Sequence, residues 1–440
     1  MKAKFIISAA IHSVLVSLIA NSFIGIWQSP QYLFLIVPIF LFICIFAGAF
    51  IVKPRRSSVC LHGTVLLYAF CTSLLCGVVY QSFLAARLLP EEHTVFIWNL
   101  VYCVGVNFVI FWIGILCVYL ASAQLGAKLR IVGAICGLIP LVNLIALFFI
   151  IKSTTAECML EIQKDQMNQR RSSDRICATQ YPILMVHGVF FRDTKFFNYW
   201  GRIPKELERN GAQIFYGNHP SASSVADSAA MLKERVVEIL VQTGAKKVNI
   251  IAHSKGGLDC RYAIANYGMG EYVASLTTVN TPHRGCLFAD YLLTKIPEDI
   301  KNQVAETYNK ALKRLGDKDP DFLAAVNDLT DAYCKELDAQ MPTPEGIYCQ
   351  SIGSVLTKST GGKFPLNFSY HLVKHFSGEN DGLVSEDSFQ WGEKYTLLRA
   401  PENRGISHMD IIDLSRENIS GFDVREFYVK LVNDLKNRGL

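Results

Sequence analysis

Long runs without a single charged residue occupy the first third of the chain, and they restrict its fold more than any other feature. The first run extends from Phe5 to Val52 and is interrupted only by the polar turn Gln28-Ser29-Pro30-Gln31. Further uncharged runs cover residues 59–86, 95–124 and 131–151. A helix needs about 20 apolar residues to cross a bilayer while satisfying its own backbone hydrogen bonds. The pattern therefore predicts an all-α region of about five transmembrane helices within residues 1–152.

The basic residues between these runs indicate an orientation in the membrane. Lys and Arg favour short cytoplasmic loops, and here they occupy alternate loops: Lys2 and Lys4, then Lys53, Arg55 and Arg56, then Lys128 and Arg130. This alternation places the N-terminus inside and everything beyond Lys152 on the extracytoplasmic side. Four or six spans are alternatives, and so is a cleaved signal peptide over Lys2–Ala20.

The composition changes abruptly after Ile151, which marks a domain boundary. Residues 153–178 are rich in polar and charged side chains and are expected to form a polar, helical linker. From residue 179 onward, short β-branched runs alternate with helical patterns. The expected strands are 183–186, 212–216 and 248–252, and the expected helices are 200–210 and 226–242. Strands separated by helices predict an α/β domain over 179–440, with a mostly parallel sheet and helices on both faces.

A candidate nucleophile follows the strand expected at 248–252. Ser254 lies in the segment Ala252-His253-Ser254-Lys255-Gly256, and a helical pattern begins directly after it. A serine in a tight turn between strand and helix, with small residues two positions away on each side, is typical of a nucleophile elbow. Ala252 takes the place of the usual first glycine. The alternative interpretation is a structural turn.

A serine hydroxyl needs a base, and in this fold the order along the chain is Ser, then Asp or Glu, then His. His408 satisfies this order, since it follows the last predicted strand, 395–398, in a loop that can reach back over the sheet. His371 and His375 precede the best acid and are expected to be ordinary polar residues. His283 follows the elbow too closely and is expected to fix a loop.

The candidate acid is Asp381, in the turn Gly378-Glu379-Asn380-Asp381-Gly382. There a buried carboxylate could orient the imidazole of His408. Asp387 lies in a polar run and is expected to be solvated. Asp410 lies only two residues from His408 and would have to fold back on itself. Asp387 and Asp410 are therefore the alternatives to Asp381 as the catalytic acid.

Two backbone amides are expected to form the oxyanion hole. One is that of Lys255, directly after the nucleophile, and the other is that of Val189, in the segment His187-Gly188-Val189 after the first strand. Amides that point at the developing negative charge lower the barrier substantially. His187 is expected to shape this loop, and His253 is expected to be packed beside the nucleophile without a catalytic role.

Collinear motifs over residues 181–440 resemble the secreted bacterial triacylglycerol lipases of the Pseudomonas/Burkholderia type. They are Tyr181-Pro182-Ile183 leading into Val186-His187-Gly188, Gly244-Ala245-Lys246-Lys247 before the elbow, Arg261-Tyr262, Thr281-Pro282-His283-Arg284-Gly285, and Asn380-Asp381-Gly382-Leu383-Val384. The resemblance implies an α/β-hydrolase fold, Ser254, Asp381 and His408 as the catalytic triad, and lipid-like esters as substrates.

A structural calcium is common in that family, held partly by an aspartate at the position of Asp410. The chain contains no acidic residue between Glu345 and Glu379, so the second carboxylate of the family is missing. A hard cation needs several oxygen ligands, and neither calcium nor any other cofactor is expected. The cysteines beyond residue 152 form no CxxC pair, which gives no reason to predict zinc or a particular disulfide.

A helical insertion at about 291–342 is expected between the strands of the sheet. Ile296, Ile300, Val304, Tyr308 and Leu312 recur there at a spacing of four, which predicts an amphipathic helix. Such a helix could be a lid over an acyl pocket, or an ordinary cap helix.

Together these features predict a membrane-anchored serine hydrolase that cleaves carboxylic esters of lipid-like substrates. An acyltransferase or lipid-remodelling deacylase is the alternative enzyme, and a catalytically silent membrane-bound module is the alternative of another class. A transporter is disfavoured, because the spans lack the charged residues that mark a transport path. The net charge of +5 is spread without a dense basic block, so nucleic-acid binding is not expected.

Overall fold

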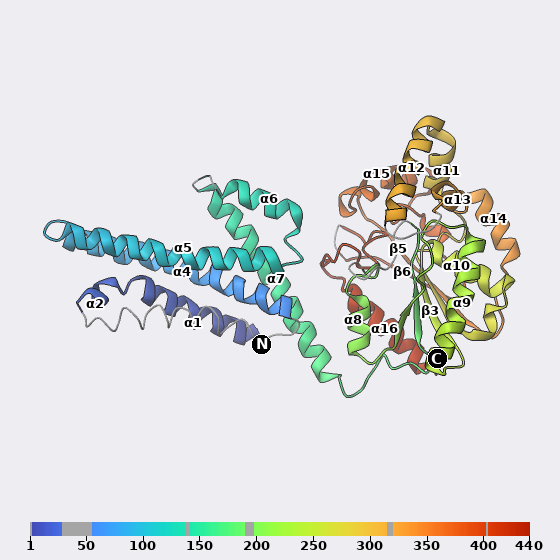
Figure 1. The fold of residues 1–440 in the computed structure, drawn as a ribbon, viewed down its shortest axis with the longest axis horizontal. Helices are drawn as coiled ribbons and strands as arrows, with labels where there is room; N and C mark the ends of the chain where they lie inside the picture. The colour runs from blue at the N-terminus through green and yellow to red at the C-terminus, as the bar shows by residue number, and fades with distance from the viewer. Residues whose placement is uncertain are drawn as a thin grey trace. The chain divides into compact units, whose positions relative to one another are not determined.

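The computed structural model describes residues 2–28, 55–137, 139, 141–189, 198–314, 320–401 and 404–440. The chain divides into two compact units, Met1–Arg170 and Arg171–Leu440 (Figure 1). This division falls inside the segment predicted as a linker, 153–178.

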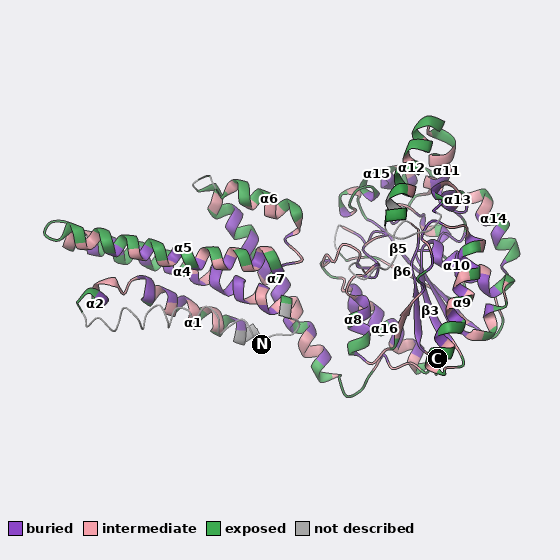
Figure 2. Cartoon of the chain, in the orientation of Figure 1, coloured by how far each residue is buried: buried purple, intermediate pink, exposed green. Residues whose placement is uncertain are grey.

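The first unit is helical throughout its described part. Its helices are α1 (Lys2–Ala20), α2 (Phe23–Trp27), α4 (Arg55–Leu88), α5 (His93–Ala121), α6 (Gly126–Cys136) and α7 (Val142–Arg170). Two stretches, Arg56–Leu88 and His93–Ala121, are long and apolar enough to cross a membrane, and Phe5–Ala20 is a shorter apolar helix. Figure 2 shows many exposed residues along α4 and α5. Among them are large apolar side chains such as Val79, 72% exposed, and Leu120, 79% exposed.

The helices of this unit agree with some of the predicted transmembrane spans and differ from others. The second half of the run from Phe5 to Val52, residues 29–52, lies outside the described residues. The run 131–151, expected to be one span, is not one helix, because α6 ends at Cys136 and α7 begins at Val142. The sequence has a proline at position 140, between the two helices, and proline is unfavourable in a helix interior because it has no amide hydrogen. The polar residues that follow, up to Arg170, continue α7.

A six-stranded parallel sheet forms the centre of the second unit, in the order β2-β1-β3-β4-β5-β6. The strands are β1 (Ile183–Val186), β2 (Ile214–Tyr216), β3 (Val248–His253), β4 (Val273–Val279), β5 (Tyr348–Ser354) and β6 (Lys394–Leu398). Every neighbouring pair is parallel. The predicted α/β class is therefore confirmed.

Helices cover both faces of this sheet because both faces of its strands are apolar. Alternate residues of β1 point to opposite faces. Ile183 and Met185 belong to the core formed with α8 (Ile203–Arg209) and α16 (Val424–Asn437). Leu184 and Val186 belong to the core formed with α9 (Val225–Thr243) and α10 (Lys255–Asn266). Continuous burial of this kind is typical of a parallel sheet between two helical layers.

The described residues between β4 and β5 form four helices at the predicted insertion: α11 (Leu287–Lys295), α12 (Glu298–Arg314), α13 (Phe322–Asn327) and α14 (Asp331–Gln340). The expected apolar stripe is only partly correct. Ile296 caps the end of α11 and lies outside α12, and Ile300 is 51% exposed. Val304 and Tyr308 line an apolar cavity, and the side chain of Leu312 lies outside the described residues. A further helix, α15 (Leu366–Ser377), lies between β5 and β6.

Candidate active site

Ser254 lies at the sharp turn between β3 and α10. Its backbone has φ 54° and ψ −132°, a conformation that costs energy for a residue with a side chain. Its amide donates a hydrogen bond to the carbonyl oxygen of Val279 on β4, at 2.9 Å, which ties the turn to the neighbouring strand. The predicted strand, strained serine and helix are thus all present.

The elbow packs closely against the loop after β1. A Cβ atom built on Gly188 would lie 2.8 Å from the Cβ of Ser254, and one built on Gly256 would lie 2.5 Å from the carbonyl oxygen of His187. Only glycine allows the two segments to approach this closely.

Substituting Gly256 with alanine is expected to destabilise the second unit by about 1–3 kcal/mol, because the new methyl group overlaps the His187 carbonyl. Thermal unfolding of the purified chain measures this effect as a lower Tm. Gly270→Ala is the matched control, since its Cβ would meet no atom closer than 3.6 Å. Equal Tm values for the two variants would contradict the close approach at Gly256.

His408 and Asp381 form a buried hydrogen-bonded pair. The imidazole Nδ1 of His408 lies 2.5 Å from Oδ2 of Asp381, and the backbone N–H of His408 donates to the carbonyl oxygen of Asp381 at 2.9 Å. The other carboxylate oxygen, Oδ1, accepts the backbone N–H groups of Leu383 and Val384, each at 2.9 Å. Asp381 is fully buried. These contacts fix the carboxylate so that it can orient the imidazole.

Asn280 is a member of this site that sequence reasoning missed. It directly follows β4, and its Nδ2 donates to Oδ2 of Asp381 at 2.6 Å and to Oγ of Ser354 at 2.8 Å. The other hydrogen bonds to this carboxylate come from Nδ1 of His408 and from the backbone N–H groups of Leu383 and Val384. The carboxylate of Asp381 therefore accepts four hydrogen bonds in all. A polar residue directly after a buried strand was the available signal, because strand ends meet at one edge of a parallel sheet.

The rival histidines lie elsewhere. His371 and His375 are exposed residues of α15. His283 is buried, with Nε2 3.0 Å from Oγ1 of Thr278 and Nδ1 3.0 Å from Nη1 of Arg261. The structure thus gives His283 the loop-fixing contacts expected for it.

The rival carboxylates also have other surroundings. Asp387 is exposed. Asp410 accepts hydrogen bonds from the backbone N–H and the hydroxyl of Ser407, at 3.1 and 2.7 Å, and forms an ion pair with Arg404 at 3.2 Å.

The described residues contain no group of three or more His, Cys, Asp or Glu side chains arranged to hold a metal ion.

A cavity of about 430 Å³ opens beside Ser254 and His408, and both residues line it. Its walls are mostly apolar and come from the insertion and from the loops around Pro365 and Ile412; they include Phe288, Leu292, Val304, Phe322 and Leu383. Val189, whose amide is one predicted oxyanion donor, also lines the cavity. Lys255, which carries the other predicted donor, is the first residue of α10, where helix amides lack intrahelical partners.

His253 packs beside the pair without joining it. Its Nδ1 lies 2.7 Å from the hydroxyl of Tyr199, which accepts the backbone N–H of Gly188 at 3.1 Å. Burial, and then the nearby His408, hold the pKa of His253 well below its usual value. His253 is therefore a neutral packing residue.

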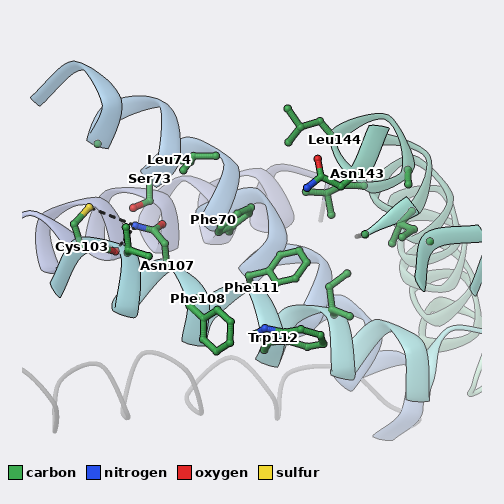
Figure 3. Close-up of a pocket in the computed structure, with 18 of the residues that line it drawn as sticks. Phe70, Ser73, Leu74, Cys103, Asn107, Phe108, Phe111, Trp112, Asn143 and Leu144 are labelled. Carbon is green, nitrogen blue, oxygen red and sulfur yellow. Dashed lines mark hydrogen bonds between the residues drawn. The ribbon is translucent and has the colours of Figure 1, made fainter. Parts of the chain in front are cut away.

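A second, larger cavity of about 730 Å³ lies in the first unit, among α4, α5, α6 and α7 (Figure 3). Its lining is mostly apolar, with aromatic side chains such as Phe70, Phe111 and Trp112. It contains no Asp, Glu, Lys, Arg or His among the described residues. Hydroxyl and thiol groups line it at Ser73, Cys103 and Tyr119, but its described lining has no histidine or carboxylate to activate them. The smaller cavity, lined by both Ser254 and His408, is therefore the candidate active site.

Known proteins resemble the second unit. Residues 165–387 match a family model described as alpha/beta hydrolase fold. The chain is 33% identical over 216 residues to a triacylglycerol lipase of Burkholderia plantarii, an alignment that covers 45% of this chain and 59% of that lipase. It is 30% identical over 290 residues to a triacylglycerol lipase of Vibrio cholerae, covering 60% of this chain and 89% of that lipase. The resemblance to bacterial lipases indicated by the motifs is confirmed.

A solved structure is also similar. The mature lipase BlEst2 of Bacillus licheniformis matches 58% of this chain and 92% of its own, with 23% sequence identity and a TM-score of 0.44. The chain spans less than two thirds of the Burkholderia relative, at 59% of its length.

Proposed function

Because this chain belongs to the family of the alpha/beta hydrolase fold, we propose that its second unit is a serine hydrolase that cleaves carboxylic esters of lipid-like substrates. One observation carries the proposal: Ser254 and His408 line the same apolar cavity, and His408 is hydrogen-bonded to a buried carboxylate. A nucleophile, a base and an orienting acid are the groups that acyl transfer requires.

In the proposed reaction, His408 removes the proton of the Ser254 hydroxyl while Oγ attacks the ester carbonyl carbon. Asp381 holds the proton on Nδ1 of the imidazole, so that Nε2 is free to accept. The tetrahedral oxyanion is stabilised by the amides of Val189 and Lys255. His408 then gives the proton to the leaving alkoxide, which departs as an alcohol. Water, deprotonated by His408, then attacks the acyl-enzyme, and the bond to Oγ of Ser254 breaks to release the carboxylic acid. His408 returns the proton to Oγ, which restores the free enzyme.

The apolar walls of the cavity favour an acyl chain over a polar group. We therefore expect detergent-purified protein to hydrolyse p-nitrophenyl esters of medium and long acyl chains as well as short ones. Activity limited to short, water-soluble esters would contradict a lipase-type function, and it would leave esterase activity in place.

Leu292→Trp is expected to lower kcat/KM for a p-nitrophenyl ester of a long acyl chain by about tenfold, because the indole fills part of the cavity. The butyrate ester needs less room and should be almost unaffected. Leu293→Trp is the matched control, since Leu293 is a neighbouring, partly buried residue of α11 outside the cavity lining. Equal losses on both esters would contradict an acyl chain in this cavity.

We further propose that the first unit is a multi-pass membrane anchor and that the hydrolase unit is extracytoplasmic. Two long apolar helices, exposed apolar side chains and the alternating basic loops support this. The chain should remain with membranes during alkaline carbonate extraction, and protease added to intact cells should degrade the hydrolase unit. Release by carbonate would contradict the anchor, and full protection from protease would contradict the orientation.

A further inference from the structure

The residue directly after the nucleophile, Lys255, forms a buried ion pair with Asp259. The Lys255 side chain is 2% exposed, and its Nζ donates to Oδ1 of Asp259 at 2.7 Å and to Oγ of Ser228 at 3.2 Å. Asp259 is 1% exposed. The sequence assigns a role only to the backbone amide of Lys255, as an oxyanion donor. The structure instead gives this side chain a defined, buried partner.

Stability alone is a poor explanation for such a pair. Removing two charges from water is costly, and apolar residues of similar volume often replace a buried ion pair without loss of stability. Burial raises the pKa of Asp259 to about 6, although the neighbouring Lys255 opposes this shift. The 2.7 Å contact with Lys255 therefore favours the charged carboxylate over the neutral acid.

Two histidines lie between this ion pair and a second segment of the chain. Oδ2 of Asp259 lies 3.7 Å from Nε2 of His219. The rings of His219 and His187 stack with centroids 4.1 Å apart and planes 3° apart. We call His187 and His219 the stacked histidines. They connect the start of α10 with the loop that follows β1.

His187 in turn contacts the backbone beside the oxyanion loop. Its Nδ1 lies 2.8 Å from the carbonyl oxygen of Gly188, and its Nε2 lies 3.1 Å from that of His219. Burial lowers the pKa of His187 to about 3, so the ring is neutral and donates to one of these oxygens at a time. Gly188 directly precedes Val189, whose amide is the second proposed oxyanion donor.

We propose that the buried pair of Lys255 and Asp259 holds the two backbone donors of the oxyanion hole at a fixed separation, through the stacked histidines. Lys255 is joined to this network by its side chain and supplies one donor by its amide. The loop of His187 supplies the other. These side chains are positioning residues, and the inference rests on the proposed hydrolase function. Displacement of a donor by even a fraction of an ångström weakens the stabilisation of the transition state.

The test is a double variant of the full chain, Lys255→Met with Asp259→Leu, which removes both charges together and puts apolar side chains in their place. We expect its Tm to stay close to that of the wild type. Its kcat for a water-soluble p-nitrophenyl ester should fall about tenfold to a hundredfold, with KM almost unchanged, because only transition-state stabilisation is lost. Arg171→Met with Glu426→Leu is the matched control, since this 2.8 Å ion pair lies outside the cavity lining. The control should retain the wild-type kcat.

A folded double variant with wild-type kcat would overturn the inference, because the pair would then be purely structural. If the double variant does not fold, His219→Phe serves instead, since it retains an aromatic ring to stack on His187 but has no ring nitrogen to face Asp259. A lower kcat at unchanged KM supports the inference, and wild-type kcat overturns it. Failure of the proposed function is distinguishable, because the wild type itself would then show no ester hydrolysis.

Discussion

Ser254→Ala is expected to lower kcat for ester hydrolysis by about 10⁶-fold, the order of loss seen when a triad nucleophile is removed. The expectation follows from the position of Ser254, which lies at the strained turn before α10 and lines the apolar cavity together with His408. Without the hydroxyl no acyl-enzyme can form, and only binding and the oxyanion donors remain. Initial rates with a p-nitrophenyl ester measure the loss.

The matched control for this variant is Ser377→Ala, at the end of α15 and outside the cavity lining. It should retain the wild-type kcat. Both variants should unfold at the wild-type Tm, so that a loss of activity cannot be assigned to unfolding. Residual activity of Ser254→Ala within about a hundredfold of the wild type would contradict the role of Ser254 as nucleophile.

Asp381→Asn is expected to lower kcat by about 10⁴-fold at neutral pH with the fold intact, since it leaves His408 in the wrong tautomer. The carboxamide oxygen must accept the backbone N–H groups of Leu383 and Val384, which now bond to Oδ1. The amide nitrogen then faces Nδ1 of His408 and donates to it. The proton of the imidazole moves to Nε2, which can no longer accept the proton of the nucleophile.

The same substitution also places two amide groups against each other. Nδ2 of Asn280 donates to Oδ2 of Asp381 in the native site, and an amide nitrogen at that position cannot accept it. Asp387→Asn changes the exposed rival carboxylate and is the matched control. If Asp381→Asn kept kcat within about tenfold of the wild type while Asp387→Asn did not, the assignment of the acid would be wrong.

The central elements of the second unit could be predicted from the sequence because local and long-range signals agree there. The run Ile183-Leu184-Met185-Val186 is β-branched or apolar at every position, and β1 covers these four residues. The Ser254 turn was equally clear, since a buried strand, a serine between small residues and a helical pattern follow each other without a gap. His408 and Asp381 were identified by their order along the chain, and the structure brings the two side chains together.

Other features depend on contacts between segments that no local pattern records. Asn280 reaches Asp381 only because β4 and the turn after α15 end at the same edge of the sheet. The ion pair of Lys255 and Asp259 has helical spacing, but its burial follows from the packing of α9 and the stacked histidines around it. The end of α6 at Cys136 and the start of α7 at Val142 are different, because the proline at position 140 in the sequence is a local signal against one continuous helix.

Labelling with a fluorophosphonate probe tests the central claim most directly, because the probe bonds covalently to an activated serine. Purified wild-type protein is incubated with the probe, digested, and analysed by tandem mass spectrometry, with Ser254→Ala treated in parallel. We predict a single adduct on Ser254 in the wild type and no adduct in the variant. Absence of labelling in the wild type, or equal labelling of Ser254→Ala, would contradict a serine hydrolase that acts through Ser254.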